Sequence, residues 1–352
     1  MFFIFQTCRD NFYNICTTII LMPELSSQIS SAATKLKAGE IVAFPTETVY
    51  GLGADISIPS AVNRIFEIKE RPANHPLIVH FSQLSQLDHW AQEIPRAARL
   101  LAKHFWPGPL TLILPRTNHV SLNVTGGQDM VGLRMPDHPT ARALLDAMGP
   151  ERALAAPSAN RFGRISPTTA AHVFDELGHK VDMILDGGLC RIGLESTIVS
   201  FKENSAIVLR PGGIPLTKLA EVLDDEVFLS EKKQSDIRVS GSLNSHYAPL
   251  TPLEIWPNTS LWERCREIEK LGLHPMLLGW SAEFLTKIKN KDFMCFPMSN
   301  EPTAYGRQLY ATLRRFDNGQ YDRLLLETPP NNPDWMAVLD RLQRASFVPP
   351  RP

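Results

Sequence analysis

The feature that most constrains the fold is an alternation of short apolar runs, each stopped by Pro, Gly or Asn, with segments of helical periodicity. Apolar runs of this length are typical of buried strands. The runs in the first part of the chain are Glu40–Phe44, Leu77–Phe81, Leu110–Leu114, Val131–Arg134, Ala153–Ala156, Met183–Leu185, Ser196–Phe201 and Ala206–Leu209. The helical segments among them are Ser26–Lys37, Pro59–Lys69, Arg96–Phe105, Pro139–Met148 and Pro167–Leu177. Interleaved elements of this kind predict an α/β fold with a twisted, mixed sheet.

Capping residues support several of these helices. Pro59 stands near the first turn of its helix, where a missing N–H costs nothing. Gly39 follows the first helix at the position of a left-handed C-terminal cap. Ser166 is the predicted N-cap of the helix that begins at Pro167, and Gly178 lies just past its end.

The domain pattern changes near Asp225. A chain of 352 residues has room for about two domains. Residues 226–250 are charged and then rich in Ser, Gly and Asn, which predicts a linker. A second, smaller α/β unit is expected over 251–352, with the strands Leu253–Trp256, Met276–Trp280 and Leu324–Glu327 and the helices Leu261–Leu271, Thr303–Phe316 and Trp335–Arg344.

Residues 1–21 form a separate leader. Its apolar stretches are broken by Arg9, Asp10 and Asn11, and no basic segment precedes them, so a signal peptide fits poorly. Helical and strand patterns begin just after Met22. We therefore expect either that Met22 is the physiological start or that the leader is disordered.

Charge and cysteine usage narrow the class of protein. The chain has 36 Lys and Arg against 37 Asp and Glu, a net charge of −1, so no global basic field indicates nucleic-acid binding. Its five cysteines include no C-x-x-C pair, which disfavours a disulfide framework or a zinc knuckle and suits a reducing cytoplasm. No apolar stretch is long enough for a membrane span. These observations predict a cytoplasmic protein.

The common nucleotide-binding motifs are absent. There is no G-x-x-x-x-G-K-[ST], and Gly51-Leu52-Gly53 lacks the third glycine of a dinucleotide loop. Polar side chains nevertheless recur at strand ends, where ligands bind in open α/β sheets. The cations among them are Lys69, Arg71, Arg134 and Arg210. Together they would suit a polyphosphate or a carboxylate.

Structural roles for the same residues stay open. Lys69 and Arg71 are also suited to a solvated helix end, where cations complement the helix dipole. Arg134 and Arg210 follow apolar runs, so each needs an anionic partner, either a ligand or one of Asp137, Asp186 and Glu195. Strand-end Ser and Thr are often turn or cap residues. His75 and His80 would then be half-buried histidines, and Met130 would pack in the core or a loop.

Several motifs in fixed order resemble one family. They are PTETVYGLG (45–53), KERPANHPLIVH (69–80), WPGPLTLIL (106–114), GLRMPDHP (132–139), APSANRFGRISPT (156–168), LESTIV (194–199) and LRPG (209–212). Together they closely resemble the YrdC-type threonylcarbamoyl-AMP synthases over most of 36–223. The later SHYAP (245–249) and the segment 305–327 look like the linker and C-terminal domain of the longer, Sua-type members. The resemblance implies a YrdC-like catalytic domain over 22–225 and a smaller, Rossmann-like α/β domain over 251–352.

The resemblance also implies a reaction. L-Threonine, bicarbonate or CO2, and ATP are joined into threonylcarbamoyl-AMP, and pyrophosphate is released, which makes the enzyme a nucleotidyltransferase. Mg²⁺ is expected with the ATP, and no metal-binding residue of the chain is predicted. A partner transferase complex then moves the threonylcarbamoyl group to tRNA, so contact of this chain with tRNA is expected to be indirect.

Site residues are carried over from the family's motifs position by position. Those expected at L-threonine are Thr48, His80, Arg134, the backbone of Ala156, and Ser196. Those expected at ATP are Lys69, Arg71, His75, the backbone near Met130, Ser158, Asn160, Ser166, Arg210 and Tyr247. Lys69 and Arg71 are predicted to be catalytic through charge stabilisation. His75 departs from the family pattern, where many members have Asn, and a neutral imidazole still donates one hydrogen bond. No residue stands out as a general base.

Two other functions are weighed against this one. A non-catalytic RNA-binding module is the main alternative, but the balanced charge and the scarcity of aromatic and basic clusters argue against strong RNA affinity. A carbamoyl-transfer enzyme of hydrogenase maturation would need zinc-finger and acylphosphatase-like segments, which this sequence lacks. Finally, Tyr247 follows the Ser/Gly-rich stretch, so the linker is expected to act as a lid that excludes water.

Overall fold

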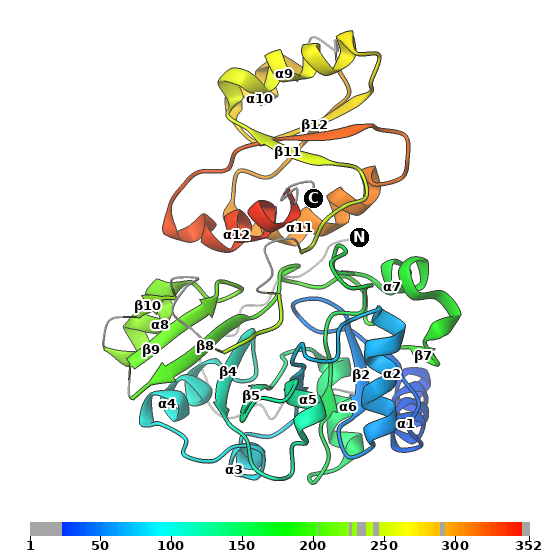
Figure 1. The fold of residues 1–352 in the computed structure, drawn as a ribbon, viewed down its shortest axis with the longest axis vertical. Coiled ribbons are helices and arrows are strands. Elements are labelled where there is room, and N and C mark those ends of the chain that lie inside the picture. Colours follow the sequence, from blue (N-terminus) through cyan, green and yellow to red (C-terminus); the bar gives the residue numbers. More distant parts are fainter. Residues whose placement is uncertain are drawn as a thin grey trace, which may run out of the picture.

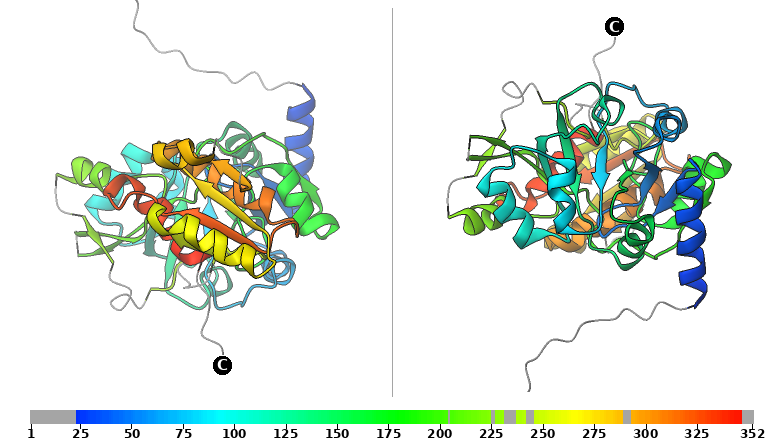
Figure 2. Two further views of the ribbon diagram at one scale, coloured as in Figure 1. Left: turned by 90° about the horizontal axis from the view of Figure 1, so that it is seen from above. Right: turned by 90° about the horizontal axis from the view of Figure 1, so that it is seen from below.

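The computed structural model describes residues 23–203, 205–224, 227–230, 237–241, 246–288 and 293–346. They form two α/β units, and the smaller C-terminal unit lies over one side of the larger unit (Figures 1 and 2). The leader 1–21 lies outside the described residues. None of the helices within these ranges has the length and apolar character needed to cross a bilayer.

The larger unit is built on a mixed sheet of ten strands in the order β10-β9-β8-β4-β5-β3-β6-β2-β1-β7. These strands are β1 (Val42–Phe44), β2 (Gly51–Asp55), β3 (Ile78–His80), β4 (Leu110–Pro115), β5 (Met130–Arg134), β6 (Leu154–Ala155), β7 (Met183–Ile184), β8 (Thr197–Lys202), β9 (Ser205–Arg210) and β10 (Phe228–Leu229). The pairs β1/β7, β3/β5, β4/β8 and β9/β10 are parallel, and the others are antiparallel. The predicted mixed sheet is therefore confirmed.

Helices cover both faces of this sheet (Figure 1). They are α1 (Pro23–Lys37), α2 (Pro59–Lys69), α3 (Leu87–Trp90), α4 (Arg96–Phe105), α5 (Leu122–Thr125), α6 (Pro139–Met148), α7 (Ala170–Leu177) and α8 (Leu216–Leu223). Alternate residues of the first strand point to opposite faces. Ile41 and Ala43 belong to the core cluster that includes α2 and α4, whereas Val42 and Phe44 pack with α1 and α6.

Three expectations for this unit are corrected. Gly51–Asp55, for which no strand was predicted, is a buried strand; a side chain at Gly53 would meet the Phe44 ring at 2.9 Å, so glycine lets β1 and β2 pack closely. The helix expected from Pro167 begins at Ala170, because Thr169 rather than Ser166 accepts the capping hydrogen bond from the His172 N–H. In the predicted linker, Phe228–Leu229 pairs with β9, so the sheet extends beyond residue 225.

The smaller unit is a four-stranded parallel sheet in the order β11-β14-β12-β13. Its strands are β11 (Leu253–Trp256), β12 (Pro275–Gly279), β13 (Cys295–Pro297) and β14 (Arg323–Glu327), and its helices are α9 (Asn258–Lys270), α10 (Ala282–Lys287), α11 (Pro302–Phe316) and α12 (Met336–Ala345). Helices α11 and α12 face the larger unit (Figure 1). One apolar cluster joins Val49, Ile165 and Leu194 of the larger unit to Tyr305 and Leu309 of α11.

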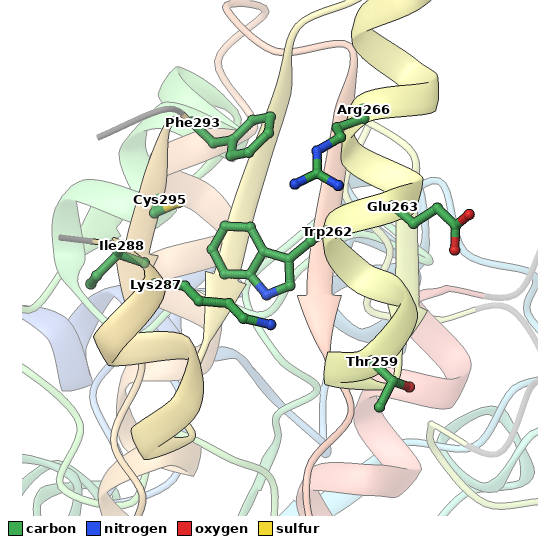
Figure 3. A pocket seen from close by; sticks show the side chains of 8 residues that line it. All are labelled: Thr259, Trp262, Glu263, Arg266, Lys287, Ile288, Phe293 and Cys295. Carbon is green, nitrogen blue, oxygen red and sulfur yellow. The ribbon is translucent and has the colours of Figure 1, made fainter. Parts of the chain in front are cut away.

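The opposite face of the smaller sheet carries a cavity between α9, α10 and β13 (Figure 3). Its volume is about 500 Å³, and its walls include Trp262, Arg266, Lys287 and Cys295. The Lys287 ammonium lies 5.6 Å from the centre of the Trp262 ring. Arg266 and Lys287 are both exposed. This cavity is distant in the fold from the strand ends at which the sequence predicts a site.

Candidate functional site

A second cavity lies where β3, β5, β8 and β9 meet the chain that enters the smaller unit. It is lined by seven predicted site residues: His80, Arg134, Ala156, Ser158, Ser196, Arg210 and Tyr247. The remaining open space is small, about 40 Å³, and His246 and Tyr247 form part of its wall. The fold therefore collects segments that are far apart in the sequence into one pocket.

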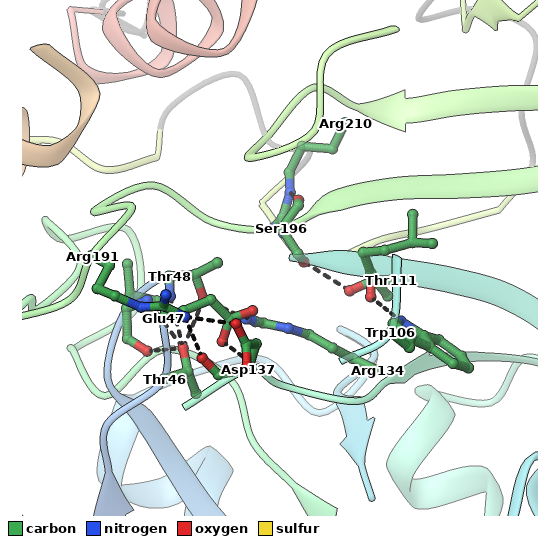
Figure 4. Close-up of polar contacts among 12 residues, drawn as sticks. Thr46, Glu47, Thr48, Trp106, Thr111, Arg134, Asp137, Arg191, Ser196 and Arg210 are labelled. Carbon is green, nitrogen blue, oxygen red and sulfur yellow. Dashed lines mark hydrogen bonds and ion pairs between the residues drawn. The ribbon is translucent and has the colours of Figure 1, made fainter. Parts of the chain in front are cut away.

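Arg134 ends β5 and is held by two groups from the loop after β1 (Figure 4). Its Nη2 donates to Glu47 Oε1 at 2.7 Å and to Thr48 Oγ1 at 2.8 Å. The second oxygen of Glu47 accepts from the Asp137 N–H at 3.0 Å. The ion-pair partner of Arg134 is thus Glu47, and not Asp137, Asp186 or Glu195. The Arg134 Nε has no hydrogen-bond partner among the described residues.

Ser196 and Arg210 form the neighbouring wall. The Arg210 Nε and Nη2 donate to the Ser196 carbonyl at 3.2 and 2.9 Å, and Nη2 also reaches Ser196 Oγ at 3.2 Å. Ser196 Oγ shares a 2.7 Å hydrogen bond with Thr111 Oγ1 on β4 (Figure 4). Burial lowers the pKa of Arg210. Its hydrogen bonds within the described ranges go to carbonyl and hydroxyl oxygens rather than to a carboxylate.

Lys69 and Arg71 are buried, which corrects the alternative of a solvated helix end; they are 1% and 6% exposed. Lys69 Nζ donates to the carbonyl oxygens of Ser158 and Asn160, so it bridges the end of α2 to the loop after β6. Arg71 Nη2 donates to the Pro76 carbonyl at 2.9 Å. Burial and then the charge of Arg71 lower the pKa of Lys69, and burial lowers the pKa of Arg71 to about 10.

Phe162 connects Arg71 to other predicted residues. The Arg71 guanidinium lies 5.5 Å from the centre of the Phe162 ring, and the His75 ring meets the same phenyl edge-on at 5.0 Å. His75 is half-buried, and burial followed by the charge of Arg71 lowers its pKa. The structure therefore groups Lys69, Arg71 and His75 beside the cavity that Arg134 and Arg210 line.

Four predicted residues make contacts of their own. Asn160 donates through Nδ2 to the Arg161 and Arg164 carbonyls, and its Oδ1 is buried without a partner in the described part of the chain. Ser166 donates to Glu195 Oε1 at 2.6 Å, so this hydroxyl is already engaged. Met130 opens β5 and packs in an apolar cluster with Val239. The Ala156 N–H donates to the Ile78 carbonyl at 2.9 Å.

The linker enters the site through His246 and Tyr247. Tyr247 has a left-handed φ of 61° and is 1% exposed, and its hydroxyl has no partner among the described residues. Its ring stacks on Tyr310 at 5.7 Å. Burial lowers the pKa of His246, and four cations lower it further: Arg71, Lys69, Arg210 and Arg341. The His246 ring meets the Phe162 ring edge-on at 6.0 Å, so the linker also contacts the cluster around Arg71.

The pKa of His80 describes the same electrostatic environment. Burial and then the charge of Arg134 lower it to about 3. The His80 ring is therefore neutral, and its Nδ1 lies 3.1 Å from the Ile78 carbonyl oxygen. A pocket with a neutral imidazole and several buried cations favours the binding of an anion.

The sequence analysis assigned no site role to four residues that line the cavity or hold its lining residues: Glu47, Thr111, His246 and Arg341. Glu47 stands inside PTETVYGLG, and its acidic charge beside an apolar strand was the available signal. Thr111 lies in the strand run LTLIL, where an isolated hydroxyl indicates a buried polar contact. Nothing in the local pattern of Arg341 indicates that it reaches the other unit.

The described side chains near the cavity offer few ligands for a protein-bound metal. No group of three or more His, Cys, Asp or Glu side chains suited to a metal ion occurs within those ranges. Glu47 and Glu195 are the acidic groups nearest the cavity, and both are bonded to arginines. These side chains do not form a cage for a resident ion.

Comparisons with known proteins agree with this architecture. A family model described as "Telomere recombination" (Sua5/YciO/YrdC) matches residues 34–212, and one described as "Threonylcarbamoyl-AMP synthase, C-terminal domain" matches 214–346. A threonylcarbamoyl-AMP synthase of Pyrococcus abyssi is 39% identical and aligns over 91% of this chain and 94% of its own length. One of Bacillus subtilis is 39% identical over 91% and 93%.

A solved structure shares the whole fold. The crystal structure of P. abyssi Sua5 complexed with L-threonine superposes with a TM-score of 0.83 at 38% identity, and covers 91% of this chain and 94% of that chain. Both units, the mixed sheet and the smaller parallel sheet, are thus those of a two-domain synthase. The chain belongs to the threonylcarbamoyl-AMP synthase family, in its long form with a C-terminal domain. The predicted family is confirmed.

Proposed function

We propose that this protein is an L-threonylcarbamoyladenylate synthase. It joins L-threonine, bicarbonate or CO2, and ATP into threonylcarbamoyl-AMP and pyrophosphate. The observation that carries the proposal is the cavity in which Arg134 and Arg210 meet the linker residue Tyr247, with the buried cations Lys69 and Arg71 beside it. Cations that are held in place before the substrate arrives stabilise polyphosphate without reorganisation. Family membership supports the same activity.

L-Threonine is assigned to the part of the pocket around Arg134. Its α-carboxylate pairs with this guanidinium, whose Nε is free of protein partners among the described residues. Glu47 and the Thr48 hydroxyl hold Arg134 Nη2 at 2.7 and 2.8 Å, and Ser196 lines the cavity. His80 and the Ala156 backbone line the same wall. A neutral His80 adds no competing charge to the amine of threonine.

The first step forms the bond between the threonine nitrogen and the carbon of CO2 or bicarbonate. The amine loses a proton, and the product is an N-carboxylate; from bicarbonate, water leaves. Since the protein holds no evident general base at this point, the proton passes to water or to the substrate's own carboxylate. The protein contributes by holding the two reactants in contact.

The second step is nucleotidyl transfer. An oxygen of the N-carboxylate attacks the α-phosphorus of ATP, the bond from this phosphorus to the β-phosphate's bridging oxygen breaks, and pyrophosphate leaves with the electron pair. An anion attacks an anion, so Lys69 and Arg71 act by stabilising charge at the reacting groups. Mg²⁺ enters with the phosphates of ATP as part of the substrate. The other residues assigned to ATP are His75, Met130, Ser158, Asn160, Ser166, Arg210 and Tyr247.

The linker serves as a lid over this chemistry. His246 and Tyr247 line the cavity and are buried at 5% and 1% exposure. An adenylate is readily hydrolysed, and a closed linker keeps water from it. The product then passes to a transferase complex that modifies tRNA, so contact of this chain with tRNA is indirect. The described cysteines Cys190, Cys265 and Cys295 are free thiols, which supports a cytoplasmic location.

The test supplies the purified protein with MgATP, labelled bicarbonate and each of several amino acids. We expect pyrophosphate release and a labelled adenylate with L-threonine and much less with the others. Release that does not depend on threonine would contradict the proposal. A salt-sensitive gel shift of RNA without ATP consumption would instead support the RNA-binding alternative.

A further inference from the structure

The side chain of Glu195 is shared by the two units, and it directly precedes the site residue Ser196. Its Oε1 accepts from Ser166 Oγ of the larger unit at 2.6 Å. Its Oε2 accepts from the Tyr310 hydroxyl of α11 at 2.9 Å and from the Arg341 Nε of α12 at 2.7 Å. The smaller unit therefore supplies two of the three groups that hold this carboxylate.

All partners of this contact are buried. Tyr310 and Arg341 are 0% exposed, and Glu195 is 7% exposed. A buried carboxylate that loses its cationic partner becomes an uncompensated charge. Burial opposes ionisation of Glu195, but Arg341 and then Arg210 keep its pKa below the ordinary value. The carboxylate thus depends on a residue that the catalytic unit does not itself contain.

The backbone at Glu195 and Ser196 connects this side chain to the pocket wall. The Gly213 N–H donates to the Glu195 carbonyl at 3.2 Å, and a side chain at Gly212 would lie 2.4 Å from the same oxygen. The next carbonyl, that of Ser196, accepts both hydrogen bonds from Arg210. Glu195 and Ser196 are consecutive, so the side chain that the smaller unit holds and the carbonyl that binds Arg210 belong to one short segment.

We propose that Arg341 and Tyr310 are positioning residues of the synthase site, which hold Glu195 so that Ser196 faces the bound amino acid. The C-terminal domain then completes the threonine site and does more than cover it. This inference rests on the proposed function, and it assigns to two residues of α11 and α12 a share in threonine affinity. Neither residue lines the cavity.

The test measures L-threonine affinity by calorimetry in the absence of ATP, together with steady-state pyrophosphate release, on the full chain. Arg341→Met should weaken threonine binding about tenfold or more, and Tyr310→Phe about threefold, because each removes a hydrogen bond to a buried charge. Arg341→Lys keeps a cation and should recover part of the loss. A merely structural role would lower the melting temperature of these variants without changing threonine affinity in the folded protein.

Tyr305→Phe is the matched control. Tyr305 lies on the same helix, is 0% exposed, and its hydroxyl has no hydrogen-bond partner in the described ranges. Its variant should bind threonine as the wild type does. If Arg341→Met does not fold, the threonine affinities of Tyr310→Phe and Arg341→Lys test the inference. Unchanged threonine affinity in the folded variants overturns the inference, whereas a wild type that neither binds threonine nor releases pyrophosphate overturns the proposed function.

Discussion

The cavity between α9, α10 and β13 and the cavity beside Arg134 differ in size and in how deeply their cations are buried. The cavity on the smaller unit has a volume of about 500 Å³, and the one in the catalytic unit about 40 Å³. Arg266 and Lys287 line the larger cavity and are exposed, whereas Arg210, which lines the smaller one, and Lys69, which is bonded to its wall residue Ser158, are 2% and 1% exposed. Water solvates the first pair of cations, whereas the second pair is bonded to neutral oxygens of the protein. The candidate site is distinguished by the burial of its cations and not by the volume of its cavity.

The largest expected effect tests this contrast directly. Lys69→Ala and Arg71→Ala should each lower threonine-dependent pyrophosphate release by about 100-fold or more, because each removes preorganised positive charge at the reacting phosphate. The measurement is kcat/KM for MgATP in proteins with a native circular dichroism spectrum. Lys287→Ala is the matched control from the other cavity. If Lys69→Ala keeps activity within a factor of two or three of wild type, Lys69 does not stabilise charge at the reacting phosphate.

The next effect concerns the buried pair Glu47–Arg134, whose side chains are 1% and 6% exposed. Glu47→Ala should reduce the free energy of unfolding by about 3 kcal/mol, since it leaves Arg134 buried and unpaired. Saturating L-threonine should restore part of this loss by supplying a carboxylate to the same guanidinium. Urea unfolding with and without threonine measures both quantities. A variant that threonine stabilises less than wild type would place the substrate carboxylate elsewhere.

The pH dependence of stability gives a smaller effect. The folded pKa of His80 is about 3, against an ordinary value of 6.5, so its neutral form stabilises the fold fully above pH 6.5. As the pH falls below 6.5, the unfolded state binds the proton first, and stability is lost by about 1.4 kcal/mol per pH unit until the folded pKa is reached. His80→Gln removes this titration. Its stability between pH 7 and pH 5 should therefore fall less steeply than that of wild type, and equal slopes would contradict the burial of a neutral imidazole.

The smallest effect is expected in the larger cavity. Lys287 pairs with Glu283 at 3.2 Å while both side chains are largely exposed, so Lys287→Ala should change stability by about 0.5 kcal/mol or less. Pyrophosphate release should stay within about twofold of wild type, as should that of Arg266→Ala. Thermal unfolding and the coupled assay check this. A large loss of activity in either variant would make the second cavity part of the catalytic cycle.

Most of the fold was predictable because its elements carry local signals. Arg96–Phe105 and Pro139–Met148 have the bounds that their periodicity predicts. The strand Gly51–Asp55 was missed because its glycines reflect close packing against Phe44, which no local pattern records. The predicted N-cap at Ser166 was wrong because tertiary contact with Glu195 engages that hydroxyl. The domain bounds and the roles of the site residues remain predictions.

The sequence alone determined the α/β class, the order of the motifs and the kinds of side chain that stand at the strand ends, because periodicity and strand ends are local properties of the chain. Only the tertiary structure decided that Arg134 pairs with Glu47, that His246 lines the cavity, and that Arg341 crosses between the units. These contacts join residues 87 to 146 positions apart, or depend on the depth of burial. Charge pairing and desolvation are set by distance in space, and the spacing of residues along a chain does not specify that distance.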